Sequence, residues 1–404
     1  MNYLVSEYYL NRGFKTRDIE KARLYELICA EDGTSRKRMN QKLRLRPNNV
    51  SDSVQQLTED ELVYEDAEVR IQGKGRPEVI LHPRFDRLVA ISVGVSSNTL
   101  TADLIDMEGK SVWQKSLPVP DDADNTVFLE SLVRLIIELE YCITKRQILV
   151  GIGIAVPGIV SANGTRWVFN SRWPEVSNLD FSKLSVRFKV PVRLYRFLDS
   201  QLNALIFRNV SINDSSIILV HWGYGIGAAY CINGKIPSLV AGSSSEIGHM
   251  KIVPPKDATL CRCGERGCLE TVSSGWALQK HLESVLGTFP SDEKELGRLM
   301  ASCDFSGDPV IKRAVESVAC VIDNTHRVFP ADRIIVYGPF IGNQLIRRAL
   351  VETIREKLPW YSKASVEIEI MTRDFEDITA LGCCADFFKT RLIEMLAFRG
   401  TDNN

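Results

Sequence analysis

Residues 246–270 read EIGHMKIVPPKDATLCRCGERGCLE, and this stretch decides how the rest of the chain is interpreted. It holds Cys261, Cys263 and Cys268, with His249 twelve residues before the first cysteine. Thiolates and imidazole suit tetrahedral zinc, and four such ligands close a structural site without an open position. Free cysteines are often small buried hydrophobes, but these three are flanked by Arg, Glu and Gly. The pattern therefore predicts one structural Zn²⁺ bound by these four side chains.

Two carboxylates, Glu246 and Glu270, bracket the predicted zinc site. A metal would hold them and His249 in fixed positions, and fixed polar acceptors are what recognition of a polyhydroxylated ligand requires. The pattern ExGH followed by CxCGxxGCxE resembles the signature of the ROK family, which includes bacterial sugar kinases and sugar-responsive repressors. The resemblance implies an α/β protein with a two-lobed, actin-like (ribonuclease H-like) sugar-kinase fold.

Composition limits the class of protein. A chain of 404 residues predicts two or three domains, and 45% hydrophobic with 25% charged residues is typical of a globular protein. The net charge of −1 means that any DNA-binding surface must be local. We expect no membrane span, no secretory signal and a cytoplasmic location, since the 10 cysteines favour a reducing compartment.

Residues 1–84 carry the pattern of a winged helix-turn-helix domain. Apolar spacing predicts helices over Ile19–Cys29 and Arg36–Leu43, and Pro47 starts a third helix. Two strands, Leu62–Tyr64 and Val79–Leu81, would flank a loop over residues 73–77, and its GRP wing is similar to that of ROK repressors. An additional helix within residues 1–12 is expected, without an assigned role.

The predicted DNA-binding surface is strongly basic. Between Gly33 and Ser51 there are six basic residues and no acid, whereas a basic run by itself would only indicate a solvated helix face. The phosphate-binding candidates are Arg36, Lys37, Arg38, Lys42, Arg44 and Arg46, with Lys74 and Arg76 on the wing. The base-reading candidates are Asn48, Asn49, Ser51, Ser53 and Gln55. Asp52 departs from this pattern, because an acid there would repel phosphate.

The nucleotide-binding motifs of the kinases are degenerate in this chain. In the opening hairpin, the family's D-x-G-G-T-K has Ser92 for the Asp and Val95 for the second Gly. Tyr224 replaces the threonine of the second phosphate loop, and Pro339 replaces a glycine near the adenosine. A β-branched residue crowds the phosphate and proline removes a backbone donor. These changes predict that nucleotide chemistry has been lost.

The sugar site is partly retained. The resemblance places Asn170 and Asp199 beside the sugar, with Asp199 at the position of the kinase catalytic base. Leu198 stands where a sugar-binding asparagine is usual. By local sequence alone, Asn170 could equally be a turn residue and Asp199 a helix N-cap. The ligand-binding candidates are Asn170, Asp199, Glu246, His249 and Glu270.

The chain is interpreted as three units: residues 1–84, lobe I over 85–198 with a C-terminal helix over 377–397, and lobe II over 199–376. We expect a non-enzymatic regulator, a repressor of carbohydrate genes, that senses a sugar or sugar phosphate. It would bind a palindromic operator as a homodimer or tetramer. Two alternatives stay open: an ATP-dependent sugar kinase with a DNA-binding arm, and a regulator controlled by a protein partner.

Overall fold

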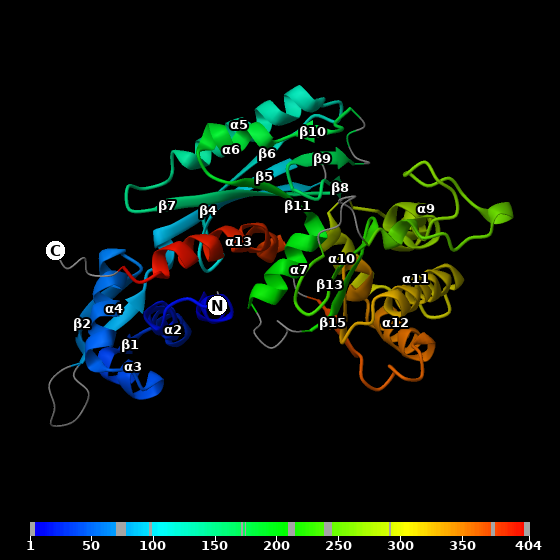
Figure 1. The fold of residues 1–404 in the computed structure, drawn as a ribbon. Helices are drawn as coiled ribbons and strands as arrows, with labels where there is room; N and C mark the ends of the chain where they lie inside the picture. Colours follow the sequence, from blue (N-terminus) through cyan, green and yellow to red (C-terminus); the bar gives the residue numbers. More distant parts are fainter. Residues whose placement is uncertain are drawn as a thin grey trace.

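The computed structural model describes residues 5–69, 78–96, 99–170, 173, 175–208, 215–237, 245–290, 292–372 and 376–399. Within these ranges the chain forms an N-terminal domain and two α/β lobes (Figure 1). The predicted wing loop, with Lys74 and Arg76, lies outside the described residues. No helix in the described ranges is long and apolar enough to span a membrane.

The N-terminal domain has the predicted helix-turn-helix followed by a β-hairpin. Its elements are α1 (Val5–Asn11), α2 (Thr16–Glu31), β1 (Thr34–Ser35), α3 (Arg36–Leu43), α4 (Pro47–Glu59), β2 (Val63–Val69) and β3 (Glu78–Pro83), and the sheet order is β1-β3-β2. Ser35 caps α3 by accepting a hydrogen bond from the Arg38 amide at 3.3 Å, and Pro47 is the first residue of α4. The bounds predicted for α3 are confirmed.

Lobe I is built on a mixed five-stranded sheet. Its strands are β4 (Leu88–Ser96), β5 (Thr99–Asp106), β6 (Ser111–Pro118), β7 (Ile148–Val156) and β11 (Val192–Arg196), in the order β11-β7-β4-β5-β6. Strands β4, β7 and β11 run parallel, while β5 and β6 are antiparallel. Helix α5 (Asn125–Glu140) packs on β5 and β6, and α13 (Glu376–Leu396) on β4 and β7. A small sheet of β8 (Ile159–Val160), β9 (Arg166–Phe169) and β10 (Leu179–Asp180), followed by α6 (Ser182–Phe188), completes the lobe.

Lobe II has a four-stranded sheet, with β13 (Ile226–Cys231), β12 (Ile217–Trp222), β14 (Arg333–Tyr337) and β15 (Glu367–Met371) in that order. Its helices are α8 (Glu270–Ser273), α9 (Gly275–Leu286), α10 (Glu293–Ser302), α11 (Pro309–Val328) and α12 (Gln344–Lys357). The core strands are continuous apolar runs, as expected where helices cover a parallel sheet. Helix α11 buries a long face that includes Ile311, Val318 and Ile322.

Two helices connect the lobes. Helix α7 (Phe197–Arg208) follows β11 directly, and α13 packs against α7 in the centre of the molecule (Figure 1). Their crossing depends on Gly382, because a Cβ atom there would lie 1.7 Å from the Ser200 carbonyl oxygen. From this crossing α13 extends to the N-terminal domain, so one helix contacts the interlobe region and the predicted DNA-binding domain.

Candidate functional site

The predicted metal ligands come together in lobe II. His249 ends the short helix η3 (Ile247–His249), and the three cysteines follow in a loop held by the turn at Gly264. The four ligand atoms all lie within 4.8 Å of one another. The Cys261 Sγ to His249 Nδ1 distance is 3.7 Å, and Cys263 Sγ to Cys268 Sγ is 3.8 Å. Ligands about 2.3 Å from one tetrahedral metal lie about 3.8 Å apart, so this arrangement could hold a metal ion.

Two thiols of this cluster have raised pKa values in the absence of a metal. Burial, together with the neighbouring thiols, raises the pKa of Cys261 to about 12 and raises that of Cys268 as well. The Cys261 and Cys268 thiols therefore resist becoming thiolates by themselves, and a bound divalent cation would reverse this by stabilising the thiolate form. The lysine closest to the cluster, Lys251, donates to Cys268 Sγ at 3.3 Å.

Glu270 is held by the backbone of the degenerate phosphate loop. One carboxylate oxygen accepts from the Ile226 amide at 2.8 Å, and the other from the Trp276 indole Nε1 at 3.0 Å. Because Glu270 begins α8 two residues after Cys268, the metal cluster and this loop are directly connected. Arg262, within the cysteine loop, adds a second link, since its guanidinium stacks on the rings of Tyr224 and Trp276.

A second carboxylate occupies the same loop. Glu293, in the first turn of α10, accepts from the Tyr224 amide at 2.6 Å and lies 2.8 Å from His221 Nε2. Its oxygen would lie 2.2 Å from a Cβ atom at Gly223, so only glycine permits the approach. Two amides of the loop thus donate to carboxylates of this chain. Sequence analysis missed Glu293, because nothing near it in the chain indicates its partners.

The His221–Glu293 pair is electrostatically coupled. Burial by itself would lower the pKa of His221, but the Glu293 carboxylate outweighs it and raises that pKa. Burial acts to raise the pKa of Glu293, and attraction to His221 with its hydrogen bond lowers it overall. The pair therefore favours the ion-paired form, in which the Glu293 carboxylate stays ionised and accepts from the Tyr224 amide.

Ser92 and Val95, which replace motif residues in the opening hairpin, are both buried. Ser92 is 3% exposed and its hydroxyl lies 3.1 Å from Cys383 Sγ on α13, while Val95 is 2% exposed. Both side chains belong to the interior of lobe I. Pro339 begins the short helix η5 (Pro339–Gly342), packed against α10.

An arginine links two candidate sugar-binding carboxylates. Arg196 ends β11 of lobe I and is 7% exposed. Its guanidinium donates to Asp199 Oδ1 at 3.3 Å, to Glu246 Oε1 at 3.1 Å and to the Ala228 carbonyl of β13 at 3.4 Å. Because Glu246 and Ala228 belong to lobe II, this contact joins the two lobes. Sequence analysis missed Arg196, which is fifty residues before Glu246.

Asp199 is inside a helix and not at its N-cap, since α7 begins at Phe197. Burial is the main cause that raises the pKa of Asp199; the Arg196 charge opposes this shift and Glu246 adds to it. Leu198 occupies the adjoining space, because a Cβ atom at Gly227 would lie 2.6 Å from Leu198 Cδ1. The Asp199 carboxyl is therefore ion-paired with Arg196 beside the apolar Leu198.

Asn170 is bound within its own loop. Its side chain is buried, donates to the Val176 carbonyl at 2.8 Å and accepts from the Trp173 amide at 2.7 Å. These bonds match the turn role that the local sequence left open. A cleft of about 430 Å³ does lie between the lobes and α13, and it is lined by residues including Arg196, Asp199, Lys235 and Lys389. Of the five ligand-binding candidates, only Asp199 lines it.

The DNA-binding candidates of α4 are mostly on the surface. Arg44, Arg46, Asn48, Ser51 and Gln55 are exposed. Ser53 is an error of the sequence analysis: it is 2% exposed, because it shares the buried face of α4 with the apolar residues Val50, Val54 and Leu57.

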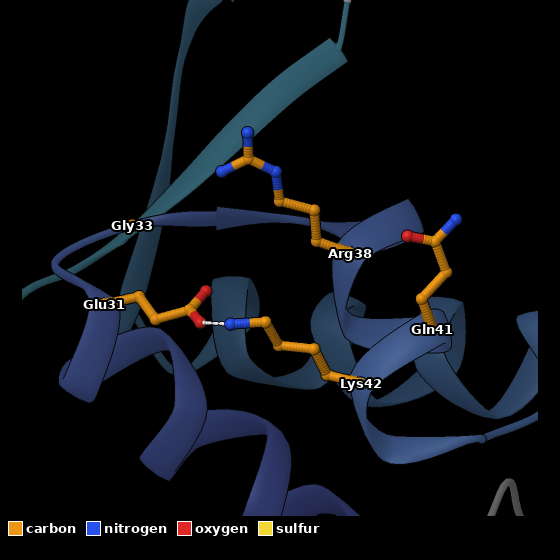
Figure 2. Close-up of a pocket in the computed structure, with 5 residues that line it drawn as sticks. All are labelled: Glu31, Gly33, Arg38, Gln41 and Lys42. Atoms are coloured by element: carbon orange, nitrogen blue, oxygen red, sulfur yellow. Dashed lines mark hydrogen bonds and ion pairs between the residues drawn. The ribbon is translucent and has the colours of Figure 1, made fainter.

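Several basic candidates are paired with acids of the same domain. Lys42 contacts Glu31 beside a pocket of about 340 Å³ that Arg38, Gln41 and Gly33 also line (Figure 2). Arg36 pairs with Glu65 at 2.6 Å and Lys37 with Glu78 at 3.2 Å. The base-reading candidate Asn49 donates to Glu20 at 2.9 Å, and Asp52 lies 3.9 Å from Arg17. In the described part of the domain, Arg44 and Arg46 make no ion pair. A nucleic acid would meet these two arginines without first displacing an acid.

One family profile and two relatives of known function match most of this chain. The ROK family profile matches residues 88–390. The chain is 27% identical over 280 residues to the xylose repressor of Bacillus subtilis, covering 66% of this chain and 69% of that protein. It is 24% identical over 336 residues to the DNA-binding transcriptional dual regulator NagC of Escherichia coli, covering 80% of each chain.

Two solved structures have a similar fold. A ROK family transcriptional regulator, a homolog of the E. coli MLC protein, superimposes with a TM-score of 0.71 at 20% identity, covering 94% of this chain and 98% of that chain. A ROK family glucokinase from Streptomyces griseus, in complex with glucose and AMPPNP, superimposes with a TM-score of 0.58 at 18% identity, covering 74% and 98%. The larger coverage of the first structure includes the N-terminal domain.

Proposed function

Since the chain belongs to the ROK family, we propose that it is a DNA-binding transcriptional regulator of carbohydrate genes, acting as a repressor in the cytoplasm. The observation that carries the proposal is the occupied phosphate loop. Glu293 and Glu270 accept from the Tyr224 and Ile226 amides, and a helix-turn-helix domain precedes this altered kinase body. Phosphoryl transfer depends on holding nucleotide phosphates, and a carboxylate that already accepts from a loop amide competes with a phosphate for that amide.

The DNA-binding surface would be formed by α3 and α4, with α4 in the major groove. Arg44 and Arg46 would contact phosphates, and Asn48, Ser51 and Gln55 would face base edges. Arg36, Lys37, Lys42 and Asn49 would join them after exchanging their acidic partners for DNA. A homodimer or tetramer reading a palindromic operator follows from the two-fold symmetry of such sites.

The metal cluster would bind one structural Zn²⁺ through His249, Cys261, Cys263 and Cys268, leaving no open position for catalysis. Zinc would hold the loop that carries Arg262 and, through the start of α8, the position of Glu270. The metal would thus keep Glu270 in place against the Ile226 amide of the loop.

A sugar or sugar phosphate would act as effector by binding one lobe arrangement better than another. Asp199, Glu246, His249 and Glu270 remain its candidate contacts, with Asn170 in the adjoining loop. A second candidate function, control by a protein partner, is favoured by the internal bonding of these side chains. The kinase alternative retains Asp199 but lacks an open phosphate loop.

Three measurements on the full chain test the proposal. Selection from a random duplex library should yield a palindromic sequence, whereas recovery of no sequence would refute DNA regulation. A coupled assay for ADP release with hexoses should show no turnover for the wild type, and turnover would make the protein a kinase. A thermal-shift screen of sugars and sugar phosphates should then identify the effector; stabilisation by none would favour control by a protein partner.

A further inference from the structure

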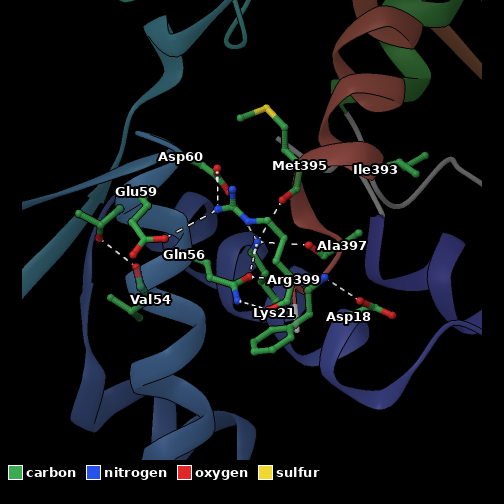
Figure 3. Close-up of polar contacts among 12 residues, drawn as sticks. Asp18, Lys21, Val54, Gln56, Glu59, Asp60, Ile393, Met395, Ala397 and Arg399 are labelled. Carbon is green, nitrogen blue, oxygen red and sulfur yellow. Dashed lines mark hydrogen bonds and ion pairs between the residues drawn. The ribbon is translucent and has the colours of Figure 1, made fainter. Parts of the chain in front are cut away.

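A lysine ammonium is completely buried between the N-terminal domain and the end of the chain. Lys21, on α2, has 0% exposure. Its Nζ donates to Gln56 Oε1 at 3.1 Å and to the carbonyl oxygens of Met395 and Ala397 at 3.0 and 3.5 Å (Figure 3). The Asp60 carboxylate lies 3.7 Å away. Lys21 therefore bridges α2, the end of α4 and the end of α13.

The segment after α13 makes further polar contacts with the same domain. Asp18 accepts from the Phe398 amide at 2.6 Å. Gln56 donates to the Arg399 carbonyl at 2.8 Å and accepts from its amide at 3.2 Å, and the Arg399 guanidinium donates to Asp60 at 2.9 Å (Figure 3). We name this set, Asp18, Lys21, Gln56 and Asp60 with residues 395–399, the C-terminal lock.

The stability of the lock depends on each acceptor around the Lys21 ammonium, because that charge is buried. Removing an ammonium from water is costly unless acceptors surround it, and burial is the main cause that lowers the pKa of Lys21. The carbonyls that Lys21 contacts are at the C-terminal end of α13, which carries a partial negative charge. Lys21 thus stabilises the end of α13 only while both elements keep their relative position.

The lock connects the interlobe region with the proposed reading helix. Gln56 is in the last turn of α4 and Asp60 is its C-cap. Helix α13 has 21 residues and so spans about 31 Å. Near its middle, Asp386 and Lys389 line the cleft between the lobes. Tyr9 of α1 adds a contact, because its hydroxyl donates to the Ile393 carbonyl.

We propose that the C-terminal lock sets the orientation of α4 relative to the two lobes, with Lys21 as its positioning residue. A shift of α13 at the lobe crossing then moves the reading helix as a unit, and the DNA-binding domain cannot reorient independently. This inference rests on the proposed function, since α4 is taken to read DNA. Lys21 itself touches no DNA, because its ammonium is buried.

The test compares Lys21→Met with a chain that ends after Leu396, and with both changes combined. The truncation removes the contacts of the lock at Ala397, Phe398 and Arg399 without altering the N-terminal domain, so it remains informative if Lys21→Met fails to fold. Lys15→Met, at an exposed position on the same domain, is the control. The measurement is affinity for the duplex selected by the wild type and for a random duplex.

Each change should weaken binding to the selected duplex at least tenfold and leave binding to the random duplex within about twofold, because buried Lys21 contributes no phosphate contact. The combined variant should bind no more weakly than the worse single variant, since each change is expected to release the whole lock. Three results would overturn the inference: affinity losses of the two single changes that multiply in the combined variant, an equal loss of affinity for both duplexes, or no loss of affinity.

A measurement without DNA separates this inference from the proposed function. Hydrogen exchange of the free protein should be faster for amides of α4 in Lys21→Met and in the truncated chain than in the wild type or Lys15→Met. Unchanged exchange would overturn the lock even if the wild type selects an operator. Faster exchange with no selected duplex would retain the lock and refute DNA regulation.

Discussion

Replacing Arg196 by methionine should loosen the contact between the lobes. The change keeps an apolar stem but removes the charge that lies between Asp199, Glu246 and the Ala228 carbonyl. Removing one partner of a buried ion pair costs about 3–5 kcal/mol. Glu246 has a side chain that is 41% exposed and is resolvated easily, whereas Asp199 is 20% exposed. The expected loss is therefore about 2–3 kcal/mol of unfolding free energy.

Calorimetry provides the measurement. A loss of this size should lower the melting temperature by roughly 4–12 °C for a lobe of this size. Arg193→Met is the matched control: Arg193 is exposed on the same strand, and its guanidinium stacks on the Tyr195 ring. The control should change the unfolding free energy by no more than about 0.5 kcal/mol.

The loss should depend on pH in a defined direction. Burial already raises the pKa of Asp199, and removing Arg196 takes away the charge that lowers it. A carboxyl whose pKa is higher in the folded state destabilises that state when ionised, and protonation relieves the penalty. The deficit of Arg196→Met should therefore shrink as the pH falls from about 7 to about 5. A deficit equal to that of Arg193→Met, or independent of pH, would refute the reasoning.

Protein purified without added metal should carry about one zinc per chain, and Cys268→Ser should lower both the metal content and the melting temperature; a folded, metal-free wild type would contradict this. Arg46→Ala should weaken binding to every duplex and reduce the salt slope by about one. Lys42→Ala should weaken binding less, because Lys42 is already paired with an acid. Equal losses of affinity in the two variants would refute this ranking. Glu293→Gln should lower the unfolding free energy most between pH 4.5 and pH 6.5, which are the ordinary pKa values of a glutamate and a histidine side chain. This effect is lost as pH rises through the raised pKa of His221 or falls through the lowered pKa of Glu293, and a flat pH profile of the difference in unfolding free energy would contradict the pairing.

Structural features that are set by residues close together in the chain could be predicted from the sequence. The metal cluster lies within twenty residues, so its spacing was sufficient to indicate that the four side chains can meet. The bounds of α3 follow from the Ser35 cap, and the start of α4 follows from Pro47. The altered residues Ser92, Val95 and Tyr224 were visible as departures from a motif. Each of these signals is contained in a single turn, helix or strand.

The partners of the charged groups depended on the tertiary structure. Glu293 is 72 residues from His221, Arg196 is 50 from Glu246, and Lys21 is 374 from Met395. No local pattern encodes such pairs, because they form only when packed elements bring the groups together and exclude water. The burial of Ser53, in contrast, could have been predicted from the sequence, because Ser53 lies three residues after Val50 and therefore on the apolar face of α4. The sequence by itself thus predicted elements such as α3 and the meeting of the four candidate metal ligands. Only packing decided which carboxylates fill the phosphate loop and which lysine joins the DNA-binding domain to α13, because the energy of a buried charge is set by the groups that surround it in three dimensions.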